Sequence, residues 1–146
     1  MEAAKKDYIQ KLEFLTHALQ EQYTVNNLDE FLRGWFFSFP FPAWVKNTNL
    51  TMVAVNPAYT QEYGITLEEY AGLKDEDAWK LQDFNALDRA VMKEERSKIK
   101  IETLFNRKVG RRQTVVVCKW PLYIDGALIG PAGFCLELEG LPDAGQ

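Results

Sequence analysis

Few residues in this chain combine a reactive side chain with the spacing that catalysis needs. The single histidine, His17, lies far along the chain from any candidate nucleophile, and we interpret it as a surface or dimer-face residue. No Cys/His cluster has the spacing of a zinc site, no glycine-rich loop opens a helix after a strand, and no nucleophile elbow occurs. Three acidic residues, Asp83, Asp88 and Glu102, are interpreted as helix caps or solvated side chains. We therefore expect no catalytic residue, no metal ligand and no enzyme activity.

The two cysteines, Cys118 and Cys135, are too few for a disulfide scaffold and are typical of reduced thiols in buried strands. A two-residue hairpin at Asp125–Gly126 would place Cys118 across from Gly133 and Cys135 across from Val116. The thiols would then be diagonal neighbours on one face, with Cα atoms about 7 to 8 Å apart. That separation exceeds comfortable disulfide reach, so we expect both cysteines to be free.

The composition indicates one folded domain. The chain has 146 residues, of which 47% are apolar and 13% aromatic, enough to build a core at this length.

The net charge of −4 provides no broad footprint for nucleic acid or anionic lipid. We interpret the basic turn formed by Arg107, Lys108, Arg111 and Arg112 as a solvated loop tip. No stretch reaches the roughly 18 apolar residues of a membrane span, and no signal-peptide pattern opens the chain. We therefore expect a cytoplasmic protein with small-molecule or protein partners.

Two helical segments precede the first strand. Residues 4–23 place Tyr8, Leu12, Leu15 and Leu19 at helical spacing, which predicts an amphipathic helix. A second short helix is predicted from Asn27 to about Trp35, and the prolines at 40 and 42 end it.

A hairpin and several short helices follow. Residues 43–47 and 51–56 are predicted strands joined by a tight polar turn. Asn56 and Pro57 have the types that cap and start a helix, which Gly64 then ends. Thr66 and Glu69 have the spacing of a capping box for another short helix, and residues 75–79 are predicted to form a further turn.

The remaining elements are one longer helix and three strands. Asp83 is predicted to cap the helix, with Phe84, Leu87 and Val91 on one side. Residues 98–106 alternate as a half-covered strand, and residues 113–138 read as two long strands joined by the Asp125–Gly126 turn. Because Pro121 and Pro131 cannot donate to a ladder, they indicate bulges. The pattern predicts an α+β fold: a five-stranded antiparallel sheet with helices on one face and an N-terminal helical extension.

The stretch PAWVKNTNLTMVAVNPAYTQEYGITLEEYAG, residues 42–72, resembles the first half of a PAS sensory domain. The family pattern places two strands before Asn-Pro-Ala-aromatic, then a short helix, Tyr-Gly, and a small helix ending in Gly. In this chain the pattern falls on Asn56–Tyr59, Tyr63–Gly64 and Gly72. The resemblance extends over residues 39–138, and it implies residues 1–37 as a helical extension for dimerisation or capping, 38–139 as the PAS domain and 140–146 as a loose tail.

The resemblance implies a sensory, signal-transducing module, the regulatory domain of a larger signalling protein or transcription regulator. Such a module would bind a small organic ligand or transmit a signal through dimer packing. The alternative is a ligand-free interaction or dimerisation module. The ligand-binding residues implied are Tyr59, Tyr63, Trp79, Phe84, Leu87, Val91, Val117, Trp120 and Phe134. The same side chains could equally fill a packed core, and the sequence leaves both interpretations open.

The cofactors of related domains can be compared with residues of this chain. Haem held by a histidine of the long helix is excluded, because residues 83–97 contain no histidine. A cysteinyl-flavin adduct is excluded as well, because the stretch DAWKLQDFN, residues 77–85, contains no cysteine. Non-covalent flavin near Trp79 and an unidentified small organic ligand stay open.

The N-terminal helix is the predicted dimer element. Its stripe of Tyr8, Leu12, Leu15 and Leu19 spans under three heptads, too short to associate strongly alone. The stripe must be buried either on the outer face of the sheet or against its copy in a second subunit. Because PAS domains often use such a helix in both ways, we expect a homodimer and an effector domain outside this chain.

Overall fold

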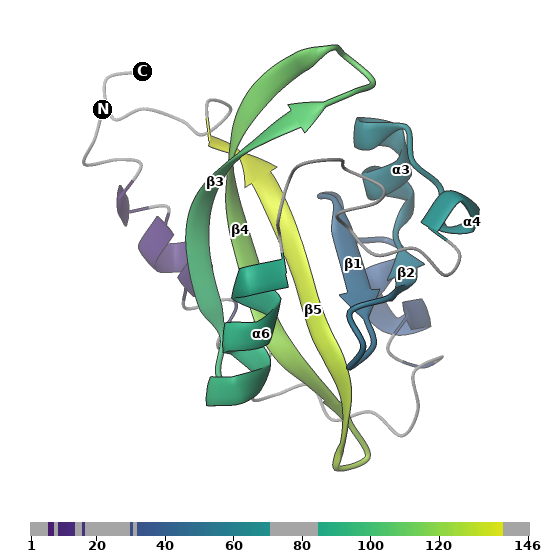
Figure 1. The fold of residues 1–146 in the computed structure, drawn as a ribbon, viewed down its shortest axis with the longest axis vertical. Coiled ribbons are helices and arrows are strands. Elements are labelled where there is room, and N and C mark those ends of the chain that lie inside the picture. The colour runs from purple at the N-terminus through teal and green to yellow at the C-terminus, as the bar shows by residue number, and fades with distance from the viewer. Residues whose placement is uncertain are drawn as a thin grey trace.

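The computed structural model describes residues 6–7, 9–13, 16, 30, 32–70 and 85–138, and Figure 1 shows their arrangement. The elements in chain order are η1 (Leu32–Phe36), β1 (Ala43–Lys46), β2 (Met52–Val55), α3 (Pro57–Tyr63), α4 (Leu67–Tyr70), α6 (Asn85–Glu94), β3 (Lys98–Asn106), β4 (Arg111–Ile124) and β5 (Ala127–Glu137). Helical residues also lie between 6 and 16, within the predicted N-terminal helix.

The five strands form one antiparallel sheet in the order β2-β1-β5-β4-β3. Figure 1 shows β3, β4 and β5 as long curved strands, with α6 in front of them and α3 and α4 beside β1 and β2. The predicted α+β class, the five antiparallel strands and the helices on one face are therefore confirmed.

Local capping explains why the helices begin and end where they do. Asn56 precedes α3, and its Oδ1 accepts from the backbone N–H of Tyr59 at 2.9 Å. Gly64 ends the helix in the left-handed region, at φ 67°, where glycine carries no steric penalty. At α4, Thr66 Oγ1 accepts from the N–H of Glu69 at 3.3 Å, and Glu69 Oε1 accepts from the N–H of Thr66 at 3.2 Å. The predicted cap and capping box are confirmed, whereas Gly72, residues 75–79 and Asp83 lie outside the described residues.

A bulge in the β4–β5 hairpin changes the predicted register. Tyr123 pairs with Leu128, but Leu122 pairs with Gly130, so one extra residue enters β5 beside the Pro121–Pro131 pair. Cys118 therefore lies across from Phe134, and Cys135 across from Val117. Both thiols are free, but they lie on opposite faces of the sheet, because a shift of one residue reverses the face. The expectation that they are diagonal neighbours on one face was wrong.

The core has two layers, one on each face of the sheet. The cluster on the outer face contains Phe36, Ala43, Val45, Ala54, Val116, Cys118, Trp120, Leu122, Ile124, Ala132 and Phe134. Ile9 and Leu12 of the N-terminal helix pack against this cluster. The helix thus covers the sheet of its own chain through these two residues, while Tyr8, Leu15 and Leu19 lie outside the described residues.

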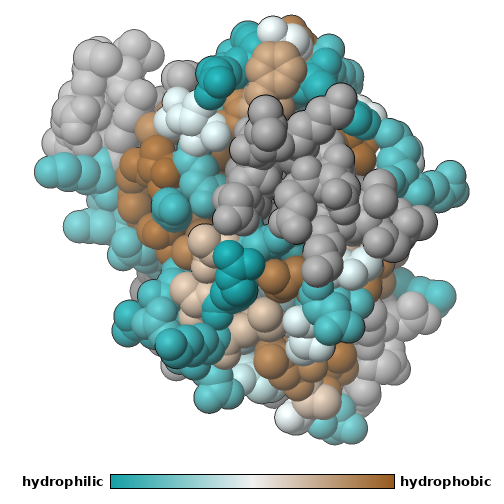
Figure 2. Space-filling view, viewed as in Figure 1, coloured by the Kyte–Doolittle hydropathy of each residue, from teal (hydrophilic) through white to brown (hydrophobic). Residues whose placement is uncertain are grey.

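The cluster on the inner face lies under the helices. It contains Trp44, Met52, Tyr59, Tyr63, Ile65, Leu104, Val115, Val117 and Cys135, with Val55 and Leu87 packed against it. Strand alternation separates the two layers, because successive side chains of a strand point to opposite faces. On the side of the molecule in Figure 2, the hydrophobic residues form separate patches divided by hydrophilic ones.

Candidate functional site

A row of aromatic side chains crosses the inner face of the sheet. The Trp44 and Tyr59 rings lie 6.0 Å apart, and the Tyr59 and Tyr63 rings 5.0 Å apart, both in edge-to-face geometry. The two tyrosines come from successive turns of α3, as their four-residue spacing requires. Edge-to-face contacts hold the rings in fixed relative orientations, so the row forms a rigid aromatic wall.

The row ends at a buried polar contact. The Tyr63 hydroxyl lies 2.9 Å from Cys135 Sγ. Burial raises the pKa of Tyr63 far above its ordinary value and raises the pKa of Cys135 to about 12. Both groups are therefore neutral near pH 7, and Cys135 is not a reactive thiolate.

A cleft of about 400 Å³ opens beside this contact, with Tyr63, Cys135 and Val115 among its walls. Residues 40–42 and the solvent-facing side of α3, at Gln61 and Glu62, also line it. The cleft therefore brings solvent up to the edge of the inner cluster.

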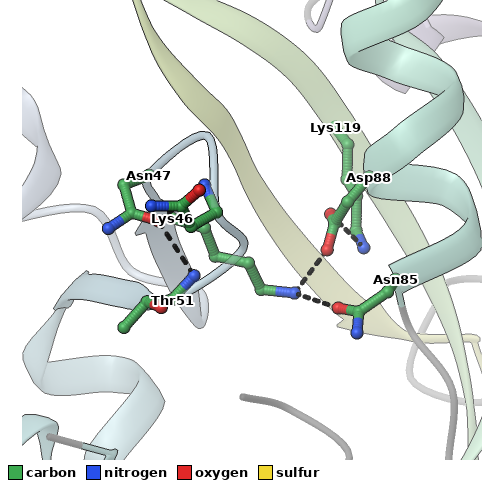
Figure 3. A network of polar contacts seen from close by, with 7 residues as sticks. Lys46, Asn47, Thr51, Asn85, Asp88 and Lys119 are labelled. Carbon is green, nitrogen blue, oxygen red and sulfur yellow. Dashed lines mark hydrogen bonds and ion pairs between the residues drawn. The ribbon is translucent and has the colours of Figure 1, made fainter. Parts of the chain in front are cut away.

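At the other end of the aromatic row, two lysines meet one aspartate. Lys46 Nζ contacts Asp88 Oδ2 in a very short ion pair, and Lys119 Nζ lies 2.7 Å from Asp88 Oδ1. Lys46 also donates to Asn85 Oδ1 at 3.5 Å. The side chains of Lys46 and Asp88 are 0% exposed and that of Lys119 is 2% exposed. Figure 3 shows the lysines reaching from the sheet toward Asn85 and Asp88 on α6.

The backbone brings these residues together. Lys46 lies at the end of β1 and Lys119 in the middle of β4, with β5 between them. Gly133 of β5 pairs with both Trp44 and Lys119, and a Cβ at Gly133 would come within 2.8 Å of the Trp44 ring. The glycine thus leaves the space that the Trp44 ring occupies, and the Lys119 ammonium lies 5.9 Å from the centre of that ring.

The charges of this cluster are concentrated in a dry environment. Asn85 and Asp88 belong to the first turn of α6, where the helix dipole adds partial positive charge. Glu102 of β3 also interacts with Lys119, Asp88 and Lys46, and burial raises the pKa of its carboxyl group. Buried ions of this kind are retained at a desolvation cost, which marks the cluster as a candidate recognition element.

The structure brings four of the predicted ligand-binding residues together: Tyr59, Tyr63 and Val117 lie in the inner cluster, and Leu87 packs against it. Val91 is fully buried on α6. Trp79 and Phe84 lie outside the described residues.

Trp120 and Phe134 lie on the other side of the sheet. Both belong to the outer cluster, with their rings 6.1 Å apart. This corrects the expectation that they share a space with Tyr59. In β4, Trp120 and Val117 are three positions apart, so their side chains point to opposite faces of the sheet. In β5, the bulge determines which residues face inward.

The charged cluster was not identified from the sequence. Asp88 was expected to be a cap or a solvated residue, but it is fully buried between two lysines. A signal was present, because Lys46 and Lys119 interrupt the apolar runs AWVKN and VVVCKWPL, and lysine is almost never fully buried unless it is paired.

The basic turn between β3 and β4 holds the helices as well as facing solvent. Arg107 forms an ion pair with Glu69 of α4 at 2.8 Å, and Lys108 donates to the backbone carbonyl of Gln61 in α3. The buried Asn106 donates to the carbonyl of Glu62 at 3.1 Å. The turn therefore ties α3 and α4 to the sheet, which modifies its interpretation as a merely solvated tip.

The described residues contain neither a group suited to a metal ion nor a membrane-spanning helix. Within the ranges described, no three His, Cys, Asp or Glu residues are grouped so as to hold a metal ion. No helix in that part of the chain is long and apolar enough to cross a membrane.

Comparisons with known proteins agree with this architecture. A family model described as PAS fold matches residues 36–139. A search of curated proteins found no match.

Three similar solved structures illustrate the fold. The PAS domain from Bordetella pertussis BvgS is 20% identical, with a TM-score of 0.55, over 76% of this chain and 85% of that one. VqmA of Vibrio cholera, in a complex with ligand and DNA, is 22% identical with a TM-score of 0.64 over 79% of this chain and 53% of VqmA. An RNA-binding light-oxygen-voltage receptor is 15% identical with a TM-score of 0.61 over 76% of this chain and 33% of the receptor.

The chain thus spans about half the length of VqmA and a third of the receptor. At these identities the likeness shows the fold alone. The family model, however, covers more than half of the residues. This chain therefore belongs to the PAS fold family.

Proposed function

We propose that this domain is a sensory module that binds a small organic ligand between its helices and the inner face of the sheet, and that regulates a larger signalling protein or transcription regulator. The observation that carries the proposal is the composition of the inner face. An aromatic wall of Trp44, Tyr59 and Tyr63 connects an open cleft with a buried charged cluster. Apolar walls with a few placed polar groups are typical of small-molecule sites.

The likeness to VqmA supports this proposal, because that protein has been solved in complex with a ligand and DNA. In our proposal the present chain corresponds to the ligand-binding part alone, and it contacts no nucleic acid or membrane itself. A non-covalently bound flavin or other planar molecule is compatible with the aromatic wall. We propose no catalytic residue and no metal ligand for this domain.

Signal transmission is proposed to work through the packing of α6 and the N-terminal helix. A ligand that binds one arrangement of α6 on the sheet better than another shifts the balance between the two arrangements. Leu12 touches the outer cluster, so a change in sheet curvature reaches the helix. We propose that Tyr8, Leu15 and Leu19 contribute to a homodimer contact.

Part of the outer face supports the dimer proposal. On β3, Ile101 pairs with Val116 of the outer cluster, and the side chains of Ile101 and Phe105 are 49% and 45% exposed. A second subunit that covers these residues would remove apolar surface from water. The alternative function, a ligand-free dimerisation module, uses the same surface but leaves the inner face as a packed core.

Native mass spectrometry and a visible absorption spectrum of the purified protein test the proposal. A co-purified small molecule, or a flavin band near roughly 450 nm, supports the sensor. A colourless dimer without a bound molecule, whose amide spectrum is unchanged by added metabolites, would instead support the ligand-free module.

A further inference from the structure

We propose that Lys46 and Lys119 recognise the carboxylate of the ligand, and that the ligand is therefore a small organic acid with a flat or apolar body. This inference rests on the proposed sensory function and names the class of molecule sensed. Three features of the inner face support it: the convergence of two ammonium groups, the local charge balance and the adjacent aromatic wall.

The two ammonium groups converge on the two oxygens of one carboxylate. Lys46 reaches Asp88 Oδ2 from β1, and Lys119 reaches Oδ1 at 2.7 Å from β4. The same pair of donors is arranged to hold any carboxylate placed at this point. Asp88 thus shows which chemical group the two lysines bind.

The electrostatic environment at the start of α6 suits an anion. Among the described residues, the lysines and Asp88 together carry a net charge of +1, and they lie at the positive end of the α6 dipole. Glu102 also interacts with the cluster, and burial raises the pKa of its carboxyl group. An acidic ligand that enters this environment meets two cations in a region of low dielectric constant.

The body of the ligand has apolar partners beside the cluster. The Trp44 ring lies next to Lys119, and Tyr59 continues the wall at 6.0 Å from Trp44. Val117 lies one inward position before Lys119 on β4. The surroundings therefore suit an aromatic or short aliphatic group attached to the acid.

Binding and signalling follow from the same contact. The ligand carboxylate competes with Asp88 for Lys46 and Lys119, so its binding weakens the attachment of α6 to the sheet. Asp88 and the ligand then share the two lysines, and the mobility of α6 reports the presence of the ligand.

Matched acids and amides test this inference on the full chain. The probes are benzoate with benzamide, indole-3-acetate with indole-3-acetamide, and hexanoate with hexanamide, each titrated by calorimetry and by thermal unfolding. The expected result is that at least one acid binds saturably and at least tenfold more tightly than its amide. Because each pair shares one shape, the difference isolates the carboxylate.

Two variants localise the effect. Lys119→Met keeps an unbranched side chain and is expected to weaken binding of the acid at least tenfold, with little effect on the amide. Lys93→Met removes an exposed charge from α6 and is expected to leave binding unchanged. If Lys119→Met does not fold, the comparison of acid and amide on the unmodified chain decides the question.

The outcomes separate this inference from the function on which it rests. Equal affinities for acid and amide, or a neutral molecule co-purified with the protein, overturn the acid assignment and uphold the sensor. Unchanged acid binding by folded Lys119→Met also overturns the role of the lysines. Absence of any co-purified molecule together with absence of binding by every probe overturns both proposals.

Discussion

Asp88→Ala is expected to destabilise the domain more than most single substitutions. The change removes the carboxylate that contacts both Lys46 and Lys119, and leaves two ammonium groups at most 2% exposed. Removing one partner from a buried ion pair costs about 3–5 kcal/mol. Since a domain of about 150 residues loses roughly 2–4 °C of melting temperature per kcal/mol, the expected fall is roughly 6–20 °C.

Urea denaturation followed by tryptophan fluorescence and by circular dichroism measures this loss. The matched control is Lys93→Ala, which removes an exposed charge from the same helix and is expected to unfold as the unmodified chain does. A triple replacement, Lys46→Met with Asp88→Leu and Lys119→Met, removes every charge of the cluster. Because apolar replacements of similar volume are often neutral or stabilising, the triple variant is expected to recover most of the stability that Asp88→Ala loses.

Two results would refute this reasoning. If folded Asp88→Ala loses less than about 1 kcal/mol, the carboxylate does not compensate two desolvated lysines. If the triple variant is less stable than Asp88→Ala, packing within the cluster, and not charge pairing, holds α6 on the sheet.

Three further predictions concern single residues. Asn56→Ala should lower the free energy of unfolding in urea by about 2–4 kcal/mol. The buried Asn56 side chain accepts from Ala43 N and Tyr59 N, and it donates to the carbonyls of Phe39 and Phe41. A loss no larger than that of an exposed Asn49→Ala control would contradict this prediction. Glu102→Gln should gain stability relative to the unmodified chain as the pH rises from 4 to 7. Burial raises the Glu102 pKa above its ordinary value of 4.5. The contribution of protonated Glu102 to the stability of the unmodified chain is therefore fully present below that value and is lost as the pH rises through the folded pKa. A gain by Glu102→Gln that is independent of pH argues against burial as the cause. Both cysteines should resist iodoacetamide at pH 8 in the folded protein and react in denaturant. Burial raises the pKa of each thiol from 9.0 to about 12, which lowers the thiolate fraction about 1,000-fold; rapid labelling of folded protein, measured by mass spectrometry, would show that one thiol is accessible.

The order and class of the elements were predictable because their signals are local. Asn56, Pro57 and Gly64 determine the start and end of α3 through backbone groups within a few residues. The alternation over residues 98–106 predicted β3 with the bounds that the structure has. The Asp125–Gly126 turn joins β4 to β5, as a two-residue hairpin requires.

The face that each strand residue occupies depends on contacts that no local pattern contains. A single extra residue after the β4–β5 turn moved Cys118 and Cys135 to opposite faces, and Phe134 to the outer one. The alternation of β3 did not reveal that Leu104 is the covered side chain while Ile101 is 49% exposed. Both outcomes depend on which elements cover each face, and that is decided by packing between distant segments.

By itself, the sequence determined the antiparallel α+β architecture, the capped helices and the resemblance of residues 42–72 to the PAS family. Each of these depends on short-range backbone chemistry and on the spacing of hydrophobic residues. Only the tertiary structure decided that Asp88 meets Lys46 and Lys119. These residues are separated by 42 and 31 positions along the chain. Their ion pairs form because folding places β1, β4 and α6 around one dry volume, where an unpaired charge would be too costly to bury.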